Sequence, residues 1–360
     1  MGKHSKSTKK TKPTKANKTT NNKKTKKKKS VFKKVLTTLI IIIVILAGVF
    51  FALVKEKMSK INYVELDTED LGISETINKG YRNIALFAVD SRNIKSDDGS
   101  RSDGIIIISI NENNKTVKMV SVYRDTFVQV DGHGLTKITH AYAYGGPTLA
   151  IKTLNQNLDL DISEFVSVNF DSVSTIVDRI GGIEITIEKD EVSQMNKYIK
   201  ETAAITGKEA KTIPKAGTYT LDGVQAVTYG RIRKTEGGDY KRTERMRTVI
   251  MKTFEKVKKM DLSTLNKIVN DVFPKIQTNI SSGEIISKAA QIKSYKIDSN
   301  LGWPYETKGK TLDAWYGVPV TLKSNVEKLH QELFDDEDYE ASETVKDISN
   351  KIIKKTGISE

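Results

Sequence analysis

Short apolar runs separated by polar turns characterise the chain from about residue 82 onward. NIALFAV at 83–89 and GIIIISI at 104–110 are predicted to be buried strands, the second of which ends at the turn-forming cluster NENN. TVKMVSV at 116–122 alternates between apolar and polar residues, and it predicts a hairpin with the strand before it. Further strands are expected at 126–130, 164–170 and 183–187 and within 294–320.

Helical spacing of apolar residues alternates with these strands. Helices are expected at 145–158, 171–182, 222–233, 240–260, 262–271, 281–290 and 323–334. Asp171 and Asp222 are the expected N-caps of two of them, and the polar stretch 190–216 gives no clear assignment. The alternation predicts an α/β protein, in which the succession of strands at 83–130 makes part of the sheet antiparallel.

An uninterrupted apolar run precedes this region. Residues 35–54, VLTTLIIIIVILAGVFFALV, contain no charged residue. A helix of this length spans ~30 Å, which is the hydrocarbon thickness of a bilayer. The run exceeds the ~7–15-residue apolar core of a signal peptide, and no small-x-small cleavage site follows it. We therefore expect an uncleaved, single-pass transmembrane helix.

Positive charge is concentrated ahead of this run. The formal net charge is +14, but residues 1–34 hold fifteen lysines and no acidic residue. Without these fifteen, 44 of the 59 basic residues remain against 45 acidic ones. The positive-inside rule then predicts a disordered cytoplasmic tail and an extracellular domain at the plasma membrane. No nucleic-acid partner is expected, because the folded part has no cationic excess.

These patterns divide the chain into segments. The expected segments are a basic tail at 1–34, a transmembrane helix at 35–54, an extracellular stalk at 55–79, a catalytic domain at 80–335 and a loose polar C-terminal tail at 336–360. The chain has no cysteine, which excludes thiol catalysis, disulfides and cysteine-ligated metals.

Arginine is distributed unlike lysine, and only ten of the 59 basic residues are arginines. They are Arg82, Arg92, Arg101, Arg124, Arg179, Arg231, Arg233, Arg242, Arg245 and Arg247. The planar guanidinium grips two oxygens of a phosphate, which an ammonium group does not. The alternative is a set of structural ion pairs, which we favour for Arg179 and Arg247. Most of the other arginines are expected to form an oxyanion-binding site.

Aspartates accompany these arginines at strand ends. Asp90 follows the strand 83–89, and Asp103 precedes the strand 104–110. Two such carboxylates suit Mg²⁺, which takes one or two carboxylates, waters and substrate phosphates and neutralises charge on a leaving phosphate. Asp125 is expected to pair with its neighbour Arg124. The four histidines show no H-x-x-x-H spacing, and His140 is expected to be buried or to support the site.

The ordered set of motifs resembles the LytR-CpsA-Psr family of Gram-positive cell-wall proteins. The motifs are NIALFAVDSR, RSDGIIIISI, VSVYRDTFV, KITHAYAYGG, VNFDSVSTIVDRIGGIEI, LDGVQAVTYGRIRK and DYKRTERMR. The resemblance covers residues 80–260 strongly and extends to 335 more loosely. It implies an α/β/α sandwich with a central mixed sheet and a groove for a polyprenyl chain. It also implies a phosphotransferase that joins an undecaprenyl-pyrophosphate-linked glycopolymer, such as wall teichoic acid or capsule, to peptidoglycan.

The resemblance also implies roles for individual residues. The metal-binding aspartates correspond to Asp90 and Asp103, with Mg²⁺ as the cofactor. The expected catalytic residues are Asp103, Arg124, Arg231 and Arg233. The expected substrate-binding residues are Arg101, Lys137, Arg242 and Arg245. Three positions depart from the family pattern: Tyr123 where proline is common, Gly104 where threonine is common, and Met246 where glutamine is common.

Two other functions remain open at this point. A pyrophosphatase would use the same pocket with water as the acceptor. A non-catalytic envelope regulator or attenuator would act through binding, and its cytoplasmic tail would then be required for function.

Overall fold

The structure is a computed structural model that describes residues 62–74, 80–91 and 99–359. The chain separates into two units, Met1–Glu56 and Lys57–Glu360, and the description below concerns the second. The expected basic tail and transmembrane helix lie outside the described residues. Among the helices that are described, none has the length and apolar character needed to cross a bilayer.

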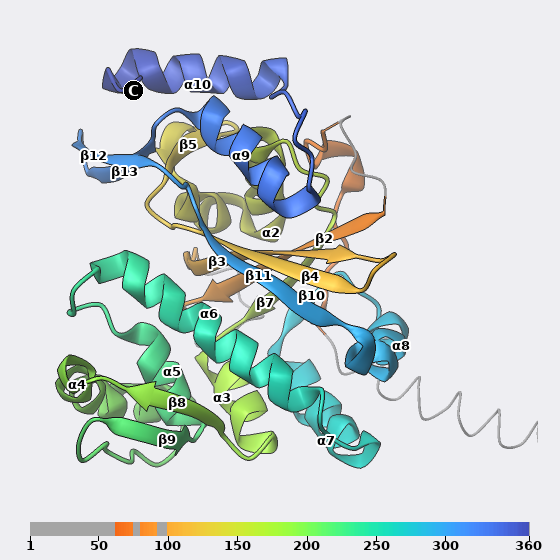
Figure 1. Ribbon diagram of the computed structural model, residues 1–360, viewed down its shortest axis with the longest axis vertical. Helices are drawn as coiled ribbons and strands as arrows, with labels where there is room; N and C mark the ends of the chain where they lie inside the picture. Colours follow the sequence, from red (N-terminus) through yellow and green to blue (C-terminus); the bar gives the residue numbers. More distant parts are fainter. Residues whose placement is uncertain (1–61, 75–79, 92–98, 360) are drawn as a thin grey trace, which may run out of the picture. The chain divides into compact units, whose positions relative to one another are not determined.

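A mixed seven-stranded sheet forms the centre of this unit, which confirms the expected α/β fold with a central mixed sheet (Figure 1). Its spatial order is β1 (Asn62–Tyr63), β10 (Gln277–Thr278), β7 (Glu164–Val168), β2 (Tyr81–Val89), β3 (Ser102–Asn111), β4 (Thr116–Val122) and β11 (Lys296–Trp303). The strands β2, β3 and β4 pair antiparallel, as the sequence predicts. The β7–β2 and β4–β11 pairs are parallel.

Helices cover one face of the sheet with a continuous apolar core. They are α2 (Ile138–Leu158), α9 (Leu322–Phe334) and α10 (Glu343–Thr356), accompanied by the hairpins β5 (Phe127–Val130)–β6 (Gly134–Lys137) and β12 (Thr307–Thr311)–β13 (Trp315–Pro319). The odd-numbered residues of β2 point into this core, with Ala85 and Phe87 fully buried. This follows from the period of two along a strand.

The even-numbered residues Leu86 and Ala88 face the opposite helical layer. That layer contains α3 (Phe170–Arg179), α5 (Gly223–Arg231), α6 (Gly238–Val257) and α7 (Leu262–Val272). Around it lie α4 (Lys189–Thr206), α8 (Ser282–Gln291), the pair β8 (Ile183–Ile187)–β9 (Gly217–Leu221), and the 3-10 turns η1 (Thr68–Asp70), η2 (Phe273–Lys275) and η3 (Ile292–Ser294). The functional site lies between this layer and the sheet.

Local signals predicted most elements but missed some. Asp222 caps α5 as expected, whereas α3 is capped by Asn169 and not by Asp171. The prediction also missed β6, the first two turns of α2 and the whole of α4. Only a narrow apolar stripe of α4 is buried, at Met195, Ile199 and Ala203, so its sequence has the polarity of a loop.

Two predicted segment boundaries are wrong. The described part of the expected stalk joins the domain, because β1 pairs with β10 and Leu66 and Leu71 are buried. The expected loose tail from 336 contains α10, which packs Val345 and Ile352 into the main core. Both segments are mostly polar and bury only one stripe, which a composition argument cannot distinguish from a solvated segment.

Candidate functional site

A β-bulge directs the side chain of Asp103 out of the sheet. Ala88 pairs with Gly104 and Val89 pairs with Ser102, so Asp103 has no partner residue across the strand. Such an extra residue bends the strand and re-aims its side chain. Ser102 is fully buried, while the side chain of Asp103 is 25% exposed. The bulge thus presents one carboxylate at the end of two core strands.

Three arginines from separate segments converge on this carboxylate. Arg124, which follows β4, donates from Nη1 to Oδ1 of Asp103. Arg233, which follows α5, places Nη2 3.3 Å from Oδ2. Arg242 on α6 places Nη1 3.7 Å from the same oxygen and donates from Nη2 to the Asp103 carbonyl at 3.1 Å. Residues more than 100 positions apart in the chain therefore form one cluster, which we call the arginine cluster: Asp103, Arg124, Arg233, Asp239 and Arg242.

Asp239 is the second carboxylate of the arginine cluster, and the sequence analysis missed it. It lies within 3.1 Å of Arg242 and 3.6 Å of Arg233. Burial raises its pKa, and the charges of Arg124 and Arg233 offset part of that rise. Its three-residue spacing from Arg242 on one helix was the available signal.

The cluster holds three guanidinium groups against two carboxylates. Burial by itself would lower the pKa of Arg124, but Asp103, Asp125 and Asp239 outweigh it and raise that pKa. Nε of Arg124 and Nε of Arg242 are buried and find no hydrogen-bond acceptor within the described part of the chain. The net positive charge and these unused donors make the cluster suited to an anion.

Lys137 extends the charged region on the side of the β5–β6 hairpin. Its ammonium group lies 2.7 Å from Oδ1 of Asp125. Asp125 also places Oδ2 3.7 Å from Nε of Arg124, so the expected pairing of these neighbours is present but loose. The closer cationic partner of the Asp125 carboxylate is therefore Lys137.

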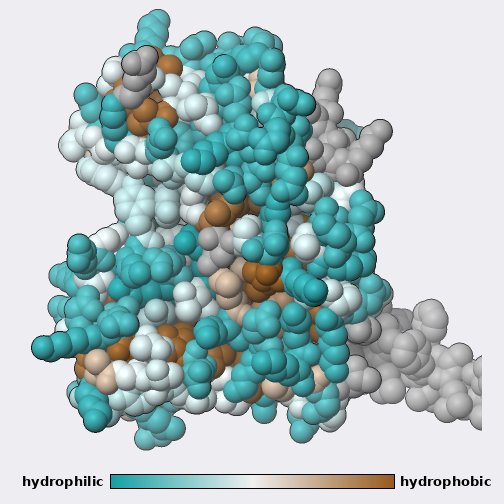
Figure 2. Space-filling view, viewed as in Figure 1, coloured by the Kyte–Doolittle hydropathy of each residue, from teal (hydrophilic) through white to brown (hydrophobic). Residues whose placement is uncertain are grey.

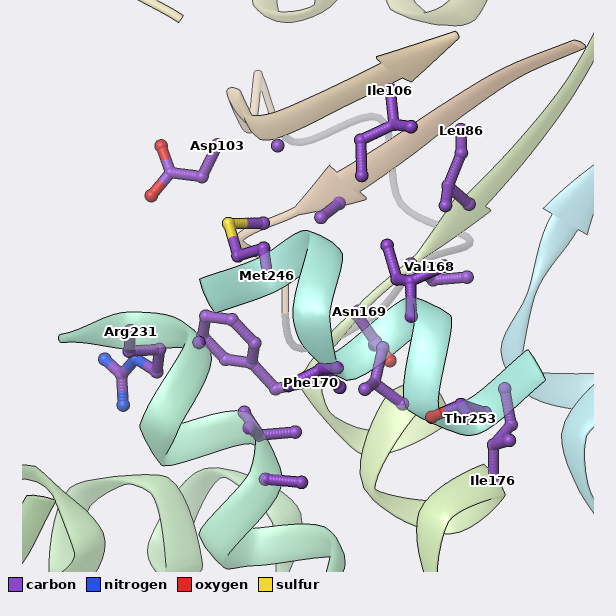
Figure 3. Close-up of a pocket in the computed structure, with 18 of the residues that line it drawn as sticks. Leu86, Asp103, Ile106, Val168, Asn169, Phe170, Ile176, Arg231, Met246 and Thr253 are labelled. Carbon is purple, nitrogen blue, oxygen red and sulfur yellow. The ribbon is translucent and has the colours of Figure 1, made fainter. Parts of the chain in front are cut away.

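An apolar pocket of about 570 Å³ opens directly beside the arginine cluster. It runs between the sheet and helices α3, α5 and α6. Asp103, Arg231, Arg233 and Arg242 line it at one end, and its walls are chiefly aliphatic and aromatic. Figure 3 shows Asp103 and Arg231 at that end, Met246 and Phe170 next to them, and Leu86, Ile106 and Val168 further in. The surface seen in Figure 2 is mostly hydrophilic, and hydrophobic side chains reach it near the middle of that face.

Arg231 contributes to the pocket from a different direction. It donates to the Thr202 hydroxyl at 2.8 Å and to Glu201 at 2.7 Å, both on α4. Its guanidinium carbon lies 4.8 Å from the ring centre of Phe170. Arg231 therefore lines the pocket beside the cluster without contacting Asp103.

Asp90 and Arg101 lie at the paired ends of β2 and β3, and both are exposed. The Asp90 amide donates to the Arg101 carbonyl at 3.4 Å. Within the described residues, the Arg101 side chain makes no hydrogen bond or ion pair. Burial lowers the pKa of His140, and the positive charges of Arg101 and Lys137 lower it further. Nδ1 of His140 shares one hydrogen bond with the Thr136 hydroxyl at 2.8 Å.

The structure places Arg245 away from the pocket, which corrects its expected contact with substrate. It is 2% exposed, and its Nε lies 2.7 Å from Glu191 on α4. Its other nitrogens donate to the Ile232 carbonyl at 3.1 Å and the Thr235 hydroxyl at 2.7 Å. These bonds secure the segment that carries Arg233, so Arg245 positions the site from behind.

The two arginines expected to be structural have structural partners. Arg247 donates to the Leu301 carbonyl at 2.9 Å, and burial lowers its pKa. Arg179 pairs with Asp271 at 2.5 Å on the surface.

The two carboxylates predicted to bind a metal, Asp90 and Asp103, both line the pocket. The described residues contain no cluster of three or more histidine, aspartate or glutamate side chains able to hold an ion. Asp90 and Asp103 line one end of the same pocket, at paired strand ends. Two carboxylates are a sufficient protein share for Mg²⁺ when phosphates supply the other ligands. The donor chemistry therefore fits an ion that arrives with its substrate.

Comparisons with known proteins agree with this geometry. The LytR_cpsA_psr family model matches residues 49–333. Polyisoprenyl-teichoic acid–peptidoglycan teichoic acid transferase TagT of Bacillus subtilis is 32% identical over 63% of this chain and 69% of the relative. TagU of Bacillus licheniformis is 31% identical over 63% of this chain and 68% of the relative. A solved structure described as TagT bound to LI-WTA aligns with a TM-score of 0.60 and 26% identity, covering 76% of this chain and 99% of that one.

Proposed function

Because this chain belongs to the LytR-CpsA-Psr family, we propose that it transfers a teichoic acid or related glycopolymer from a polyprenyl-pyrophosphate carrier to peptidoglycan. The observation that carries the proposal is the direct continuity of an apolar pocket with the arginine cluster. A lipid pyrophosphate has these two characters side by side, a hydrocarbon chain and a dense anion. We place the isoprenoid chain in the pocket and the pyrophosphate at Arg124, Arg233 and Arg242.

The pyrophosphate would replace Asp103 as a partner of the arginines. A guanidinium fork binds two phosphate oxygens at once, and fixed donors in a partly desolvated site stabilise the charge that develops during transfer. Arg231 lines the same pocket and adds a further guanidinium to the site. Arg101 and Lys137 contribute positive charge at the exposed side. We retain these roles as proposals for all six basic residues.

The transfer itself exchanges one phosphorus–oxygen bond for another. A peptidoglycan hydroxyl oxygen bonds to the sugar-bearing phosphorus, and the bond from that phosphorus to the bridging oxygen breaks. The bridging oxygen keeps the electron pair and leaves as polyprenyl phosphate. Positioning and electrostatics supply most of the catalysis in such reactions.

A carboxylate of the arginine cluster would accept the hydroxyl proton. The sequence favours Asp103, but its two carboxylate oxygens already contact three arginines. Burial raises the pKa of Asp239, which suits that carboxylate to accept a proton. We therefore assign the proton to Asp239 and an anchoring role to Asp103. Mg²⁺ held by Asp90 and Asp103 would supply neutralisation of the pyrophosphate charge.

Hydrolysis is the second candidate reaction, and the exposure of the cluster favours it. The side chains of Asp103 and Arg233 are 25% and 43% exposed, so water reaches the same phosphorus. Transfer and hydrolysis give different products: a polymer covalently joined to glycan, or a free phosphorylated polymer.

The deciding experiment uses the full-length protein in detergent. It is incubated with a polyprenyl-pyrophosphate-linked oligosaccharide and peptidoglycan oligomers, with Mg²⁺ or with a chelator. We expect a covalently joined product that requires Mg²⁺ and is lost in the Arg124→Ala and Arg231→Ala variants. Arg179→Ala, which removes a surface ion pair, is the matched control and should retain activity. Normal transfer by a folded Arg124→Ala variant would refute the proposed site.

A deletion variant distinguishes the transferase from a non-catalytic envelope regulator. A variant without residues 2–30 should keep its transfer activity if the extracellular domain is an enzyme. A regulator that acts through its cytoplasmic tail should lose its function.

A further inference from the structure

An exposed tryptophan packs over two glycines of the β12–β13 hairpin. Trp315 is 47% exposed, and Gly309 and Gly317 are paired opposite each other in the same hairpin. A Cβ atom on Gly309 would lie 3.0 Å from Nε1 and 3.4 Å from Cε2 of the indole. A Cβ atom on Gly317 would lie 3.8 Å from Cη2. The two glycines thus form a floor for one face of the ring.

Tyr240, at the start of α6, shares this floor. Its hydroxyl would lie 3.9 Å from a Cβ on Gly317, and it is hydrogen-bonded to Thr307 of β12 at 2.9 Å. The ring is 42% exposed and meets Tyr123 edge to face at 4.5 Å between centroids. The hydrogen bond to Thr307 and the contact with Tyr123 hold the Tyr240 ring in place. We call Trp315 and Tyr240 the aromatic platform.

The platform is continuous with the arginine cluster. The Gly317 amide donates to the Asp125 carbonyl at 3.0 Å. Arg124, the residue immediately before Asp125, donates a hydrogen bond to Asp103. Asp103 lines the apolar pocket, whereas Trp315 and Tyr240 do not. Along this path of contacts, the arginine cluster separates the pocket from the platform.

The geometry of phosphoryl transfer places the donor and the acceptor on opposite sides of the arginine cluster. The attacking and leaving oxygens are roughly in line through the phosphorus. If the leaving polyprenyl phosphate lies toward the pocket, the attacking hydroxyl must approach from the opposite side of the cluster. We infer that the aromatic platform lies on that side, because the path of contacts runs from the pocket through the arginine cluster to the platform. This step rests on the proposed function.

The chemistry of the platform fits a sugar ring. Large aromatic side chains offer apolar area together with a polar handle, and the carbon–hydrogen face of a pyranose packs against such a flat ring. A stable protein interface buries ~800 Å² per partner, far more than two rings provide. We propose that Trp315 and Tyr240 dock the acceptor glycan strand of peptidoglycan and hold its hydroxyl toward the arginine cluster.

The test compares full-length Trp315→Ala with wild type in the transfer assay, varying acceptor and donor separately. We expect the KM for peptidoglycan oligomers to rise at least ~10-fold, which corresponds to ~1.4 kcal/mol. The KM for the lipid-linked donor should stay unchanged. Trp315→Phe, which keeps a flat ring, should recover most of the affinity. Tyr144→Ala is the matched control, because Tyr144 is 49% exposed but stacks on His133, in the turn of the β5–β6 hairpin, and not on the platform glycines.

An unchanged acceptor KM would overturn the inference. A rise in the donor KM alone would do so as well, because the platform would then hold the donor glycan.

A binding measurement separates this inference from the proposed function. The chain has two tryptophans, and Trp303 is fully buried, so a fluorescence change on adding peptidoglycan oligomers reports on Trp315. Cosedimentation with purified peptidoglycan should be weaker for Trp315→Ala than for Trp315→Phe. Binding with these properties but without joined product would refute the transferase and support the platform. Transfer by wild type with equal cosedimentation of all variants would refute the platform alone.

Discussion

The terminal methyl of Met246 on α6 occupies the space that a Cβ atom on Gly104 of β3 would need. The same Cβ would lie 3.0 Å from Cβ of Ala88 on the neighbouring strand. Gly104 follows Asp103 directly, so the contact lies at the junction of the pocket and the arginine cluster. Two of the three departures from the family pattern are therefore one contact, in which a larger residue fills the space left by a smaller one.

The third departure has a similar partner. The hydroxyl of Tyr123 occupies the space that a Cβ atom on Gly302 of β11 would need. Tyr123 also interacts with Arg247, and burial raises its pKa. Met246 and Tyr123 are thus each accommodated by a glycine that packs against them, Gly104 and Gly302 respectively.

We predict that Gly104→Thr destabilises the protein and that Met246→Ala relieves much of that cost. Overpacking a core typically costs ~1–3 kcal/mol. In a double-mutant cycle, contacting residues show coupling of ~0.5–3 kcal/mol. Denaturant unfolding of the two single variants and the double variant measures this coupling. Additive effects would show that the contact does not constrain the two positions.

The shape of the Arg124 side chain should matter in addition to its charge. Arg124→Lys keeps a cation, but it loses the fork that faces both Asp103 and the proposed phosphate. A hydrogen bond to a charged group contributes ~1.5–3 kcal/mol, so kcat/KM for transfer should fall roughly 10- to 100-fold. Arg179→Lys is the matched control on the surface. Full activity of Arg124→Lys in the transfer assay would mean that charge alone suffices.

Arg245 should affect stability more than substrate affinity. Arg245→Met leaves Glu191 as an unpaired, 3% exposed carboxylate, and breaking such a buried pair costs ~3–5 kcal/mol. Glu191→Gln removes the stranded charge and keeps an acceptor for the Glu188 amide, so the double variant should recover part of the loss. Thermal unfolding measures both effects. A normal melting temperature together with a raised donor KM would instead restore Arg245 to the substrate site.

His330 should make the stability of the protein depend on pH. Burial lowers the pKa of His330, which is fully buried and contacts the Leu158 carbonyl through Nε2 at 2.9 Å. As the pH falls, the unfolded chain binds a proton at His330 before the folded protein does. The stability that comes from the neutral, buried His330 is therefore complete above pH ~6.5 and is lost below it. The loss has a limiting slope of ~1.4 kcal/mol per pH unit.

Denaturant midpoints between pH 5 and pH 8 test this expectation. His330→Gln should flatten the profile below pH ~6.5. His133→Gln, at an exposed position, should leave the profile unchanged. A wild-type slope that persists in His330→Gln would assign the dependence to other groups.

The sequence determined the elements that have a strong local signal. The runs at 83–89, 104–110 and 116–122 became β2, β3 and β4, because long apolar segments with turn residues between them leave few alternatives. Asp222 capped α5 for the same local reason. The mostly polar helices α4 and α10 were missed, since a single buried stripe becomes apparent only when its partner surface is present.

The composition of the sequence also indicated the chemistry. Scarce arginine within a lysine-rich chain predicted an anion site, and Arg124, Arg233 and Arg242 do meet at Asp103. Which arginines meet was decided by tertiary structure alone. Arg242 and Arg245 are neighbours on one helix, yet the rotation of α6 against the sheet and α4 turns the first toward Asp103 and the second toward Glu191. The bulge at Asp103 and the glycine floor of Trp315 are likewise products of strand register, which depends on pairing between segments and cannot be read from either segment by itself.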